Sequence, residues 1–245
     1  MSDFLQYLNS LDIKDLLNQS FIENDLLLNL GLNNEILNEQ PSHLNEFYGK
    51  GLGLKIWQYP NQFSKYLLFL SKYTNHINSY LEIGCRYGGT FILTSEFICK
   101  FNYNFNKSVA LDLINESENI KKYRENSNFV EFKKMNSNSI EFKKYLENNF
   151  FDMVFIDGDH DYQGVKNDGD ITRNKCNIQI YHDISSDICP GVAKYWKEIK
   201  ERYKNDYNFY EFTDQYDEVI KRTKKSYLGI GAAVKKEFDE KINRC

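Results

Sequence analysis

Five acidic and histidine side chains stand directly after two short apolar stretches of this 245-residue sequence. They are Asp157, Asp159, His160, His182 and Asp183. Carboxylate and imidazole groups transfer protons, and they bind cations where several of them converge. This set therefore suits general acid–base catalysis, metal binding, or both.

We interpret the two stretches as strands of a parallel sheet. Met153-Val-Phe-Ile156 is wholly apolar and contains β-branched and aromatic residues, which is typical of a strand buried on both faces. Residues 179–183 predict a further short strand that ends in His182-Asp183. In open α/β sheets, ligands bind beyond the carboxyl ends of the strands. We therefore expect the five side chains at one edge of the sheet.

A strand, a glycine-rich turn and an apolar helix are predicted over residues 79–97. The turn carries the pattern Glu82-x-Gly84-x-x-x-Gly88-Gly89, which fits neither the dinucleotide fingerprint nor the phosphate loop. Its glycines let a ligand approach the backbone, and the N-terminus of the helix offers free N–H donors. Tyr87 lies inside the turn, where it either lines a ligand pocket or packs against its neighbours.

Two more residues are candidates for ligand binding. Residues 107–112 predict a strand that ends in Asp112, whose carboxylate either accepts both hydroxyls of a ribose or caps a turn. Gln58 lies in the glycine- and aromatic-rich stretch 48–60, which either contacts a ligand or packs on the edge of the sheet.

Composition excludes several classes of partner. The net charge is -4, and no basic stripe with interleaved aromatic residues is present, so we expect no nucleic-acid partner. Five scattered cysteines without a C-x-x-C pair argue against a zinc ribbon and against a secreted disulfide framework. No apolar run reaches the length of a membrane span, and residues 1–7 do not read as a signal peptide. We expect a cytoplasmic protein without membrane insertion.

The sequence divides near residue 46. Residues 1–46 show leucines at helical spacing and no chemistry, which indicates either an N-terminal helical cap or an oligomer contact. Residues 47–245 are expected to form the functional domain.

The acidic run resembles a known signature. Phe155-Ile-Asp-Gly-Asp-His160, with Tyr162, Gly164 and Val165 after it, is similar to the signature of methyltransferases that use S-adenosylmethionine (SAM). The resemblance is to the cephalosporin-hydroxylase-like group and to antibiotic and polysaccharide sugar O-methyltransferases. The pattern Glu82-x-Gly84-x-x-x-Gly88 likewise resembles the first motif of class I SAM methyltransferases. The similarity covers roughly residues 48–235.

The resemblance implies an α/β fold, a Rossmann-like sandwich whose seven-stranded sheet has the order 3-2-1-4-5-7-6 with the last strand antiparallel. It also places the turn at Asn136 and Ser137 beside the adenine of SAM, although these residues also suit the cap of a following helix. The residues expected to contact SAM are Gln58, Glu82, Gly84, Tyr87, Gly88, Gly89, Asp112, Asn136, Ser137 and Asp157.

Members of the resembling group bind a divalent metal. Carried over by position, Asp157 and Asp183 are metal ligands, and Asp159 or His160 is the general base. His182 is a departure, because some relatives carry an acid there, so we treat it as a candidate for both ligation and catalysis. Oxygen ligands favour Mg²⁺ or Mn²⁺. Alternatively, Asp157 borders the methionine end of SAM and no metal binds.

The leading hypothesis is a metal-assisted O-methyltransferase that acts on a hydroxyl of a sugar or nucleotide-sugar. The alternative is a metal-independent N- or O-methyltransferase of another small molecule. A non-catalytic partner subunit with the same fold is a third interpretation, which the intact acids and glycines disfavour.

Overall fold

A seven-stranded sheet runs through the centre of the computed structural model, which describes residues 3–33, 35 and 38–244. Its order is β3-β2-β1-β4-β5-β7-β6, and β7 is antiparallel to both of its neighbours, as predicted. The strands are β1 (Ser79–Ile83), β2 (Lys107–Asp112), β3 (Val130–Lys134), β4 (Phe151–Ile156), β5 (Cys176–Tyr181), β6 (Tyr207–Phe212) and β7 (Ile230–Lys235).

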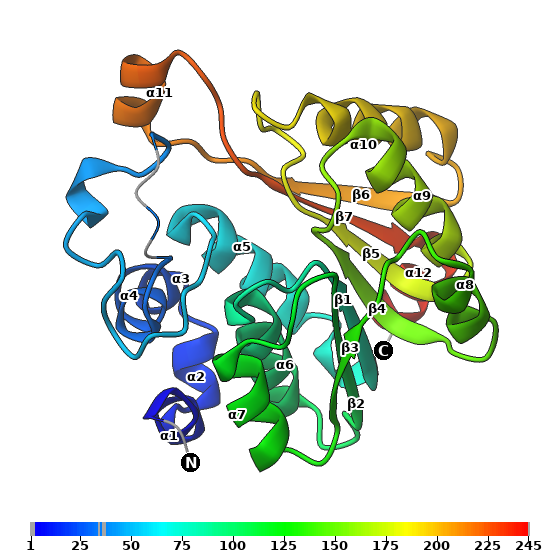
Figure 1. The fold of residues 1–245 in the computed structure, drawn as a ribbon, viewed down its shortest axis with the longest axis horizontal. Helices are drawn as coiled ribbons and strands as arrows, with labels where there is room; N and C mark the ends of the chain where they lie inside the picture. Colours follow the sequence, from blue (N-terminus) through cyan, green and yellow to red (C-terminus); the bar gives the residue numbers. More distant parts are fainter. Residues whose placement is uncertain (1–2, 34, 36–37, 245) are drawn as a thin grey trace.

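Helices cover both faces of the sheet (Figure 1). The helices packed on one face are α5 (Pro60–Ser71), α6 (Gly89–Phe101), α7 (Glu118–Asn126) and α12 (Lys236–Asn243). Those on the other face are α8 (Ile140–Glu147), α9 (Tyr162–Arg173) and α10 (Pro190–Arg202). None of the helices in the described part of the chain combines the length and apolarity that a membrane span requires.

The two faces explain why the strands are apolar throughout. In β1, Leu81 and Ile83 belong to the core beneath α8, α9 and α10, whereas Tyr80 belongs to the core beneath α5 and α6. Successive side chains of a strand point to opposite faces, so a sheet covered on both sides needs apolar residues at nearly every position. The charged residues that follow these strands therefore stand out as members of a site.

Local signals set where several helices begin. The hydroxyls of Ser117 and Ser139 accept hydrogen bonds from the backbone N–H groups of Ile120 and Phe142 and thereby cap α7 and α8. Helices α5 and α10 each begin at a proline, whose missing N–H costs nothing in the first turn. The cap of α8 is thus Ser139, and Asn136 and Ser137 remain in the preceding loop.

The N-terminal segment is helical only in pieces. It contains α1 (Asp3–Ser10), α2 (Ile13–Leu16), α3 (Gln19–Phe21), the π-helical turn η1 (Ile22–Leu26), α4 (Leu27–Leu30) and the 3₁₀ turn η2 (Ser42–Leu44). Its apolar side chains join the core cluster that contains residues of α5 and α6. The described residues between Leu30 and Ser42 form no helix and run towards the sheet edge at the carboxyl ends of the strands. Two further short helices are η3 (Thr74–His76) and α11 (Asp217–Thr223).

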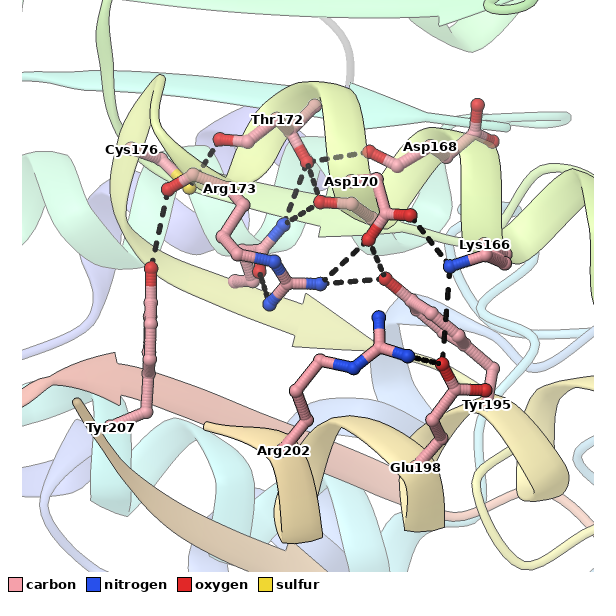
Figure 2. Close-up of polar contacts among 12 residues, drawn as sticks. Lys166, Asp168, Asp170, Thr172, Arg173, Cys176, Tyr195, Glu198, Arg202 and Tyr207 are labelled. Atoms are coloured by element: carbon pink, nitrogen blue, oxygen red, sulfur yellow. Dashed lines mark hydrogen bonds and ion pairs between the residues drawn. The ribbon is translucent and has the colours of Figure 1, made fainter. Parts of the chain in front are cut away.

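A buried polar network fixes α9 to its neighbours (Figure 2). Arg173 donates hydrogen bonds to the hydroxyl of Tyr195 at 2.6 Å, to Asp170 at 3.2 Å and to the side chain of Gln179 in β5 at 3.2 Å. Charged hydrogen bonds in a buried setting hold their partners in one arrangement. The network therefore ties together α9, α10 and β5, the elements that flank the acidic cluster.

Candidate active site

A cavity of about 970 Å³ lies at the carboxyl ends of β1, β2, β4 and β5. Twelve of the fourteen predicted site residues line it. They are Glu82, Gly84, Tyr87, Gly89, Asp112, Asn136, Ser137, Asp157, Asp159, His160, His182 and Asp183. The residues predicted from two separate motifs thus surround one space, and their individual roles remain predictions.

Gly84 brings β1 and β4 together at the base of the cavity. It has a φ of 86°, and a Cβ atom on it would lie 2.0 Å from the carbonyl oxygen of Asp157. Only glycine permits such a backbone contact at this φ. The requirement for glycine here is therefore structural, and it places the Asp157 turn directly beside the glycine-rich turn.

Gly88 and Gln58 are the two predicted site residues that do not line the cavity. Gly88 is the left-handed N-cap of α6, and its missing Cβ leaves room for Ile120 of α7. Gln58 is buried away from the cavity, whereas Lys55 and Trp57 line it.

Asp112 ends β2 at the cavity and is held there by backbone donors. Its Oδ2 accepts a hydrogen bond from the N–H of Arg86 at 2.7 Å, and its Oδ1 accepts one from the N–H of Ile114 at 3.2 Å. Leu113 and Ile114 beside it are exposed, although both are large apolar side chains. An oriented carboxylate next to exposed apolar side chains suits a ligand with hydroxyl groups and an aromatic base.

Glu82 is almost completely buried on the same face of β1 as Tyr80. The hydroxyl of Tyr80 donates a hydrogen bond to it. Burial raises the pKa of Glu82 well above its ordinary value, and this hydrogen bond only partly opposes the rise. Glu82 is thus the innermost acid of the cavity.

The acids and histidines after β4 and β5 converge as predicted. His182 Nδ1 lies 3.0 Å from Asp157 Oδ1 and 3.4 Å from Asp183 Oδ2. His160 lies between the same two acids, with Nε2 3.3 Å from Asp157 Oδ1 and Nδ1 3.5 Å from Asp183 Oδ2. Asp183 has a φ of 60°, an unusual value for a residue other than glycine.

The charges of this cluster shift its pKa values in opposite directions. Burial raises the pKa of Asp157, but the nearby charge of His182 and the hydrogen bonds of both histidines outweigh it and hold this pKa below the ordinary value. The hydrogen bond to Asp157 raises the pKa of His160 to about 11. Burial lowers the pKa of His182, yet Asp157 and Asp183 together raise it well above the ordinary value. Both histidines therefore neutralise the acids.

The same atoms fit a metal ion. One ligand atom from each of Asp157, His182 and Asp183 falls within 4.8 Å of the others, which is the set predicted for the metal. His182 is 5% exposed, and its Nε2 has no hydrogen-bond partner among the described residues. A buried polar atom without a partner is costly, so this imidazole is suited to a ligand group in the cavity.

Comparison with known proteins agrees with this geometry. Residues 81–179 match the family model described as a methyltransferase domain. This matched stretch, less than half of the chain, is therefore similar to a methyltransferase domain. A search of curated proteins found no match to the sequence.

Solved structures share the fold of this chain. MycE from the mycinamycin biosynthetic pathway, in complex with Mg and SAH, aligns with a TM-score of 0.50 and 14% identity over 72% of this chain and 50% of MycE. The chain thus spans about half the length of MycE. Human methyltransferase 10 domain containing protein aligns with a TM-score of 0.52 and 11% identity over 92% of this chain and 98% of its own. A putative RNA methyltransferase, PH1948 from Pyrococcus horikoshii, aligns with a TM-score of 0.52 and 10% identity over 91% of this chain and 98% of its own.

Asp159 is exposed at the cavity surface. Its Oδ1 accepts a hydrogen bond from the N–H of Asp161 at 2.9 Å, at the start of α9. The absent Cβ of Gly164 makes room for this carboxylate, since an added Cβ would lie 2.3 Å from Asp159 Cγ. Asp159 is therefore held at the cavity and remains open to a substrate.

Several residues that line the cavity were not predicted from the sequence. The N-terminal segment contributes Glu39, and the stretch 48–60 contributes Trp57, whose Nε1 donates a hydrogen bond to Glu39 Oε1 at 3.3 Å. The Arg86 guanidinium lies over the Trp57 ring at 4.3 Å. Cys189 lines the cavity just before α10. Of these, only Trp57 and Arg86 lay in stretches that the sequence had marked, by their glycines and aromatic residues.

Proposed function

We propose that the protein is a SAM-dependent O-methyltransferase that acts, with the help of a divalent metal, on a hydroxyl of a sugar or nucleotide-sugar. The observation that supports this proposal best is the convergence of Asp157, His182 and Asp183 in the cavity that also contains the glycine-rich turn. The relation to cephalosporin-hydroxylase-like and antibiotic sugar O-methyltransferases is part of this proposal.

The donor half of the proposed site contains the glycine-rich turn. Asp112 would accept the ribose hydroxyls of SAM, and Asn136 and Ser137 would border the adenine, next to exposed Leu113 and Ile114. Gly84, Gly89 and Glu82 would then lie along the methionine end, towards Asp157. This arrangement uses the cavity-lining residues of β1, β2 and the loop after β3.

The acceptor half lies beyond Asp157. Trp57 offers an aromatic face, and Glu39 offers a carboxylate that can accept hydrogen bonds from hydroxyl groups. Burial raises the pKa of Glu39, with Trp57 as its hydrogen-bond donor. An apolar ring with a few fixed polar groups is the usual composition of a small-molecule site. A sugar fits this combination better than a flat apolar substrate does.

Methyl transfer asks little bond chemistry of the protein, because the sulfonium of SAM is already a good leaving group. The chain must hold the acceptor oxygen in line with the methyl group, exclude water and accept the hydroxyl proton. Asp159 or His160 would accept this proton. A divalent ion held by Asp157, His182 and Asp183 would lower the pKa of a sugar hydroxyl.

The proposal is tested by incubating the protein with SAM and a panel of nucleotide-sugars, with and without a chelator. We expect SAH and a product heavier by one methylene, and a loss of at least about a hundredfold in rate when metal is removed. Asp159→Asn and His160→Asn separately test the base. Undiminished turnover in both variants would exclude these two residues from that role.

The alternative is a metal-independent N- or O-methyltransferase of another small molecule. Methylation of an amine panel at the same rate after chelation would favour it over the sugar proposal. The name of one structural neighbour mentions RNA as its substrate class. RNA is a poor acceptor for this chain, because the chain's net charge is negative.

A further inference from the structure

Three side chains at the rim of the cavity form a nearly equilateral triangle of donor atoms. Cys189 Sγ lies 3.4 Å from His160 Nδ1 and 3.4 Å from Asp183 Oδ2, and His160 Nδ1 lies 3.5 Å from Asp183 Oδ2. These three atoms form a second candidate metal site. It shares Asp183 with the first candidate site, which consists of Asp157, His182 and Asp183.

We propose that His160, Asp183 and Cys189 bind a thiophilic divalent transition-metal ion, such as Zn²⁺, and leave a fourth coordination position open to the cavity. This inference concerns the metal ion of the proposed function. It rests on that proposed function only for the role of the ion in methyl transfer. It departs from the predicted Mg²⁺ or Mn²⁺ because Mg²⁺ does not favour a thiolate ligand.

The distances suit a shared metal better than mutual hydrogen bonds. Ligand atoms at about 2.0–2.3 Å from one tetrahedral ion lie about 3.4–3.6 Å apart. Hydrogen bonds between nitrogen and oxygen have their mode at about 2.9–3.0 Å, clearly shorter than the 3.5 Å between His160 and Asp183. Without an ion, the thiol of Cys189 donates to Asp183 and contacts His160 Nδ1, and a bound metal would replace the protons that lie between these atoms.

The opposite side of the His160 ring supports ligation through Nδ1. His160 Nε2 lies 3.3 Å from Asp157 Oδ1. Histidines that bind a metal through one nitrogen commonly donate the other N–H to a carboxylate, which fixes the tautomer. Asp157 would then orient His160 as a metal ligand, which leaves Asp159 to accept the hydroxyl proton in the proposed methyl transfer.

Two backbone features hold Cys189 in place. Cys189 is the N-cap of the thirteen-residue helix α10, so the start of this helix fixes the position of the sulfur atom. Gly191, in the first turn of α10, permits close packing against the loop that carries His160, since an added Cβ would lie 2.7 Å from His160 O. The triangle is thus assembled by the fold before any ion arrives.

A ligand at this point would also meet an unsatisfied group. His182 is 5% exposed and lines the same cavity, its Nδ1 lies 3.4 Å from Asp183 Oδ2, and its Nε2 has no hydrogen-bond partner among the described residues. A metal-bound water or hydroxyl group in the cavity is a suitable partner for such an atom. His182 thus contacts a ligand of the triangle through Nδ1 and keeps a free nitrogen at Nε2.

Cobalt provides the test, because a thiolate bound to Co²⁺ gives a charge-transfer band in the near ultraviolet. The metal-stripped protein is titrated with Co²⁺, and Zn²⁺ or Mg²⁺ is then added as competitor. We expect the band to saturate at one ion per chain, to disappear with Zn²⁺ and to persist with Mg²⁺. Cys189→Ser should abolish the band. Cys85→Ser is the matched control, a cavity thiol 3.8 Å from Asp112, and should retain it.

His160→Gln covers the case in which Cys189→Ser does not fold, since His160 is exposed. It should weaken Co²⁺ binding more than about a hundredfold, because a lost direct ligand costs more than a lost outer partner. Failure of the wild-type protein to bind Co²⁺, binding without the thiolate band, or a band that survives Cys189→Ser would overturn the inference. SAH binding, measured by calorimetry on the same samples, should be unchanged in Cys189→Ser. If the wild-type protein does not bind SAH, that result would count against the proposed function and not against the metal site.

Discussion

His182 Nδ1 lies 3.0 Å from Asp157 Oδ1, and this contact joins the ends of β4 and β5 at the centre of the cavity. The pair is a structural link as well as a functional one. His182 is 5% exposed, so its charge has almost no water to stabilise it if the acid is removed.

Asp157→Asn should therefore reduce both stability and activity. We expect a loss of about 3–5 kcal/mol in the free energy of unfolding, because a buried imidazolium loses its main partner. Urea denaturation measures this loss. Asp159→Asn is the matched control, since Asp159 is exposed, and should change stability by less than about 0.5 kcal/mol. Equal losses in the two variants would contradict a structural role for the Asp157–His182 pair.

Asp112→Asn should weaken the binding of SAH. The proposed ribose contact is a hydrogen bond to a charged acceptor, and its loss corresponds to a Kd increase of roughly tenfold to a hundredfold. Isothermal titration calorimetry with SAH provides the measurement. Asp206→Asn, at an exposed position outside the cavity lining, serves as the control and should leave the Kd unchanged. An unaltered Kd in Asp112→Asn would remove Asp112 from the ribose site.

Gly84→Ala and Gly53→Ala separate backbone strain from steric overlap. Both glycines have a positive φ, 86° for Gly84 and 76° for Gly53, but only Gly84 faces a neighbouring backbone. An added Cβ at Gly53 meets nothing within 4 Å, so that variant should lose about 1–2 kcal/mol from strain alone. Gly84→Ala should lose at least about 2 kcal/mol more, because it must displace the Asp157 turn. Similar unfolding midpoints in urea would refute the close approach of the two turns.

Asp168 makes stability depend on pH. Burial raises its pKa from 3.8 to about 6, and its carboxylate points away from the α9 network (Figure 2). Between these two values the folded protein binds more protons than the unfolded chain, so the free energy of unfolding falls as pH rises through this window. Above about pH 6, the loss in the free energy of unfolding that the charged Asp168 causes levels off near 3 kcal/mol.

Asp168→Asn, which carries no charge, should therefore be more stable than the wild type at pH 8, by up to about 3 kcal/mol, and equal to it at pH 4. Urea unfolding at several pH values tests this expectation, with Asp206→Asn as the exposed control. A gain that is the same at pH 4 and pH 8 would show that the charge of Asp168 is not its cause.

Sequence reasoning was most successful where local pattern and fold geometry agree. The apolar strands that end in Asp157 and in His182-Asp183 predicted the cluster, because parallel strands deliver their carboxyl ends to one edge. The order of the seven strands followed from the resemblance and is confirmed.

Residues brought to the cavity by long-range packing were not predictable in this way. Glu39 lies in an irregular segment whose path depends on packing, and Cys189 is a lone thiol whose neighbours come from other elements. Gln58 shows a related limit. The sequence left open whether its stretch contacts a ligand or packs on the edge of the sheet, and the local pattern does not reveal that Lys55 and Trp57, and not Gln58, line the cavity.

The position of β7 has a consequence for how the chain is made. Residues 230–235 insert between β5 and β6 and supply the backbone partners of β5, the strand that carries His182-Asp183 at its end. During synthesis, β5 is complete long before its neighbour leaves the ribosome. Until then its edge presents unpaired N–H and C=O groups, which are open to pairing with another chain. The nascent protein is therefore most vulnerable to aggregation in the interval before β7 emerges, and slowing translation over residues 184–229 should lengthen that interval.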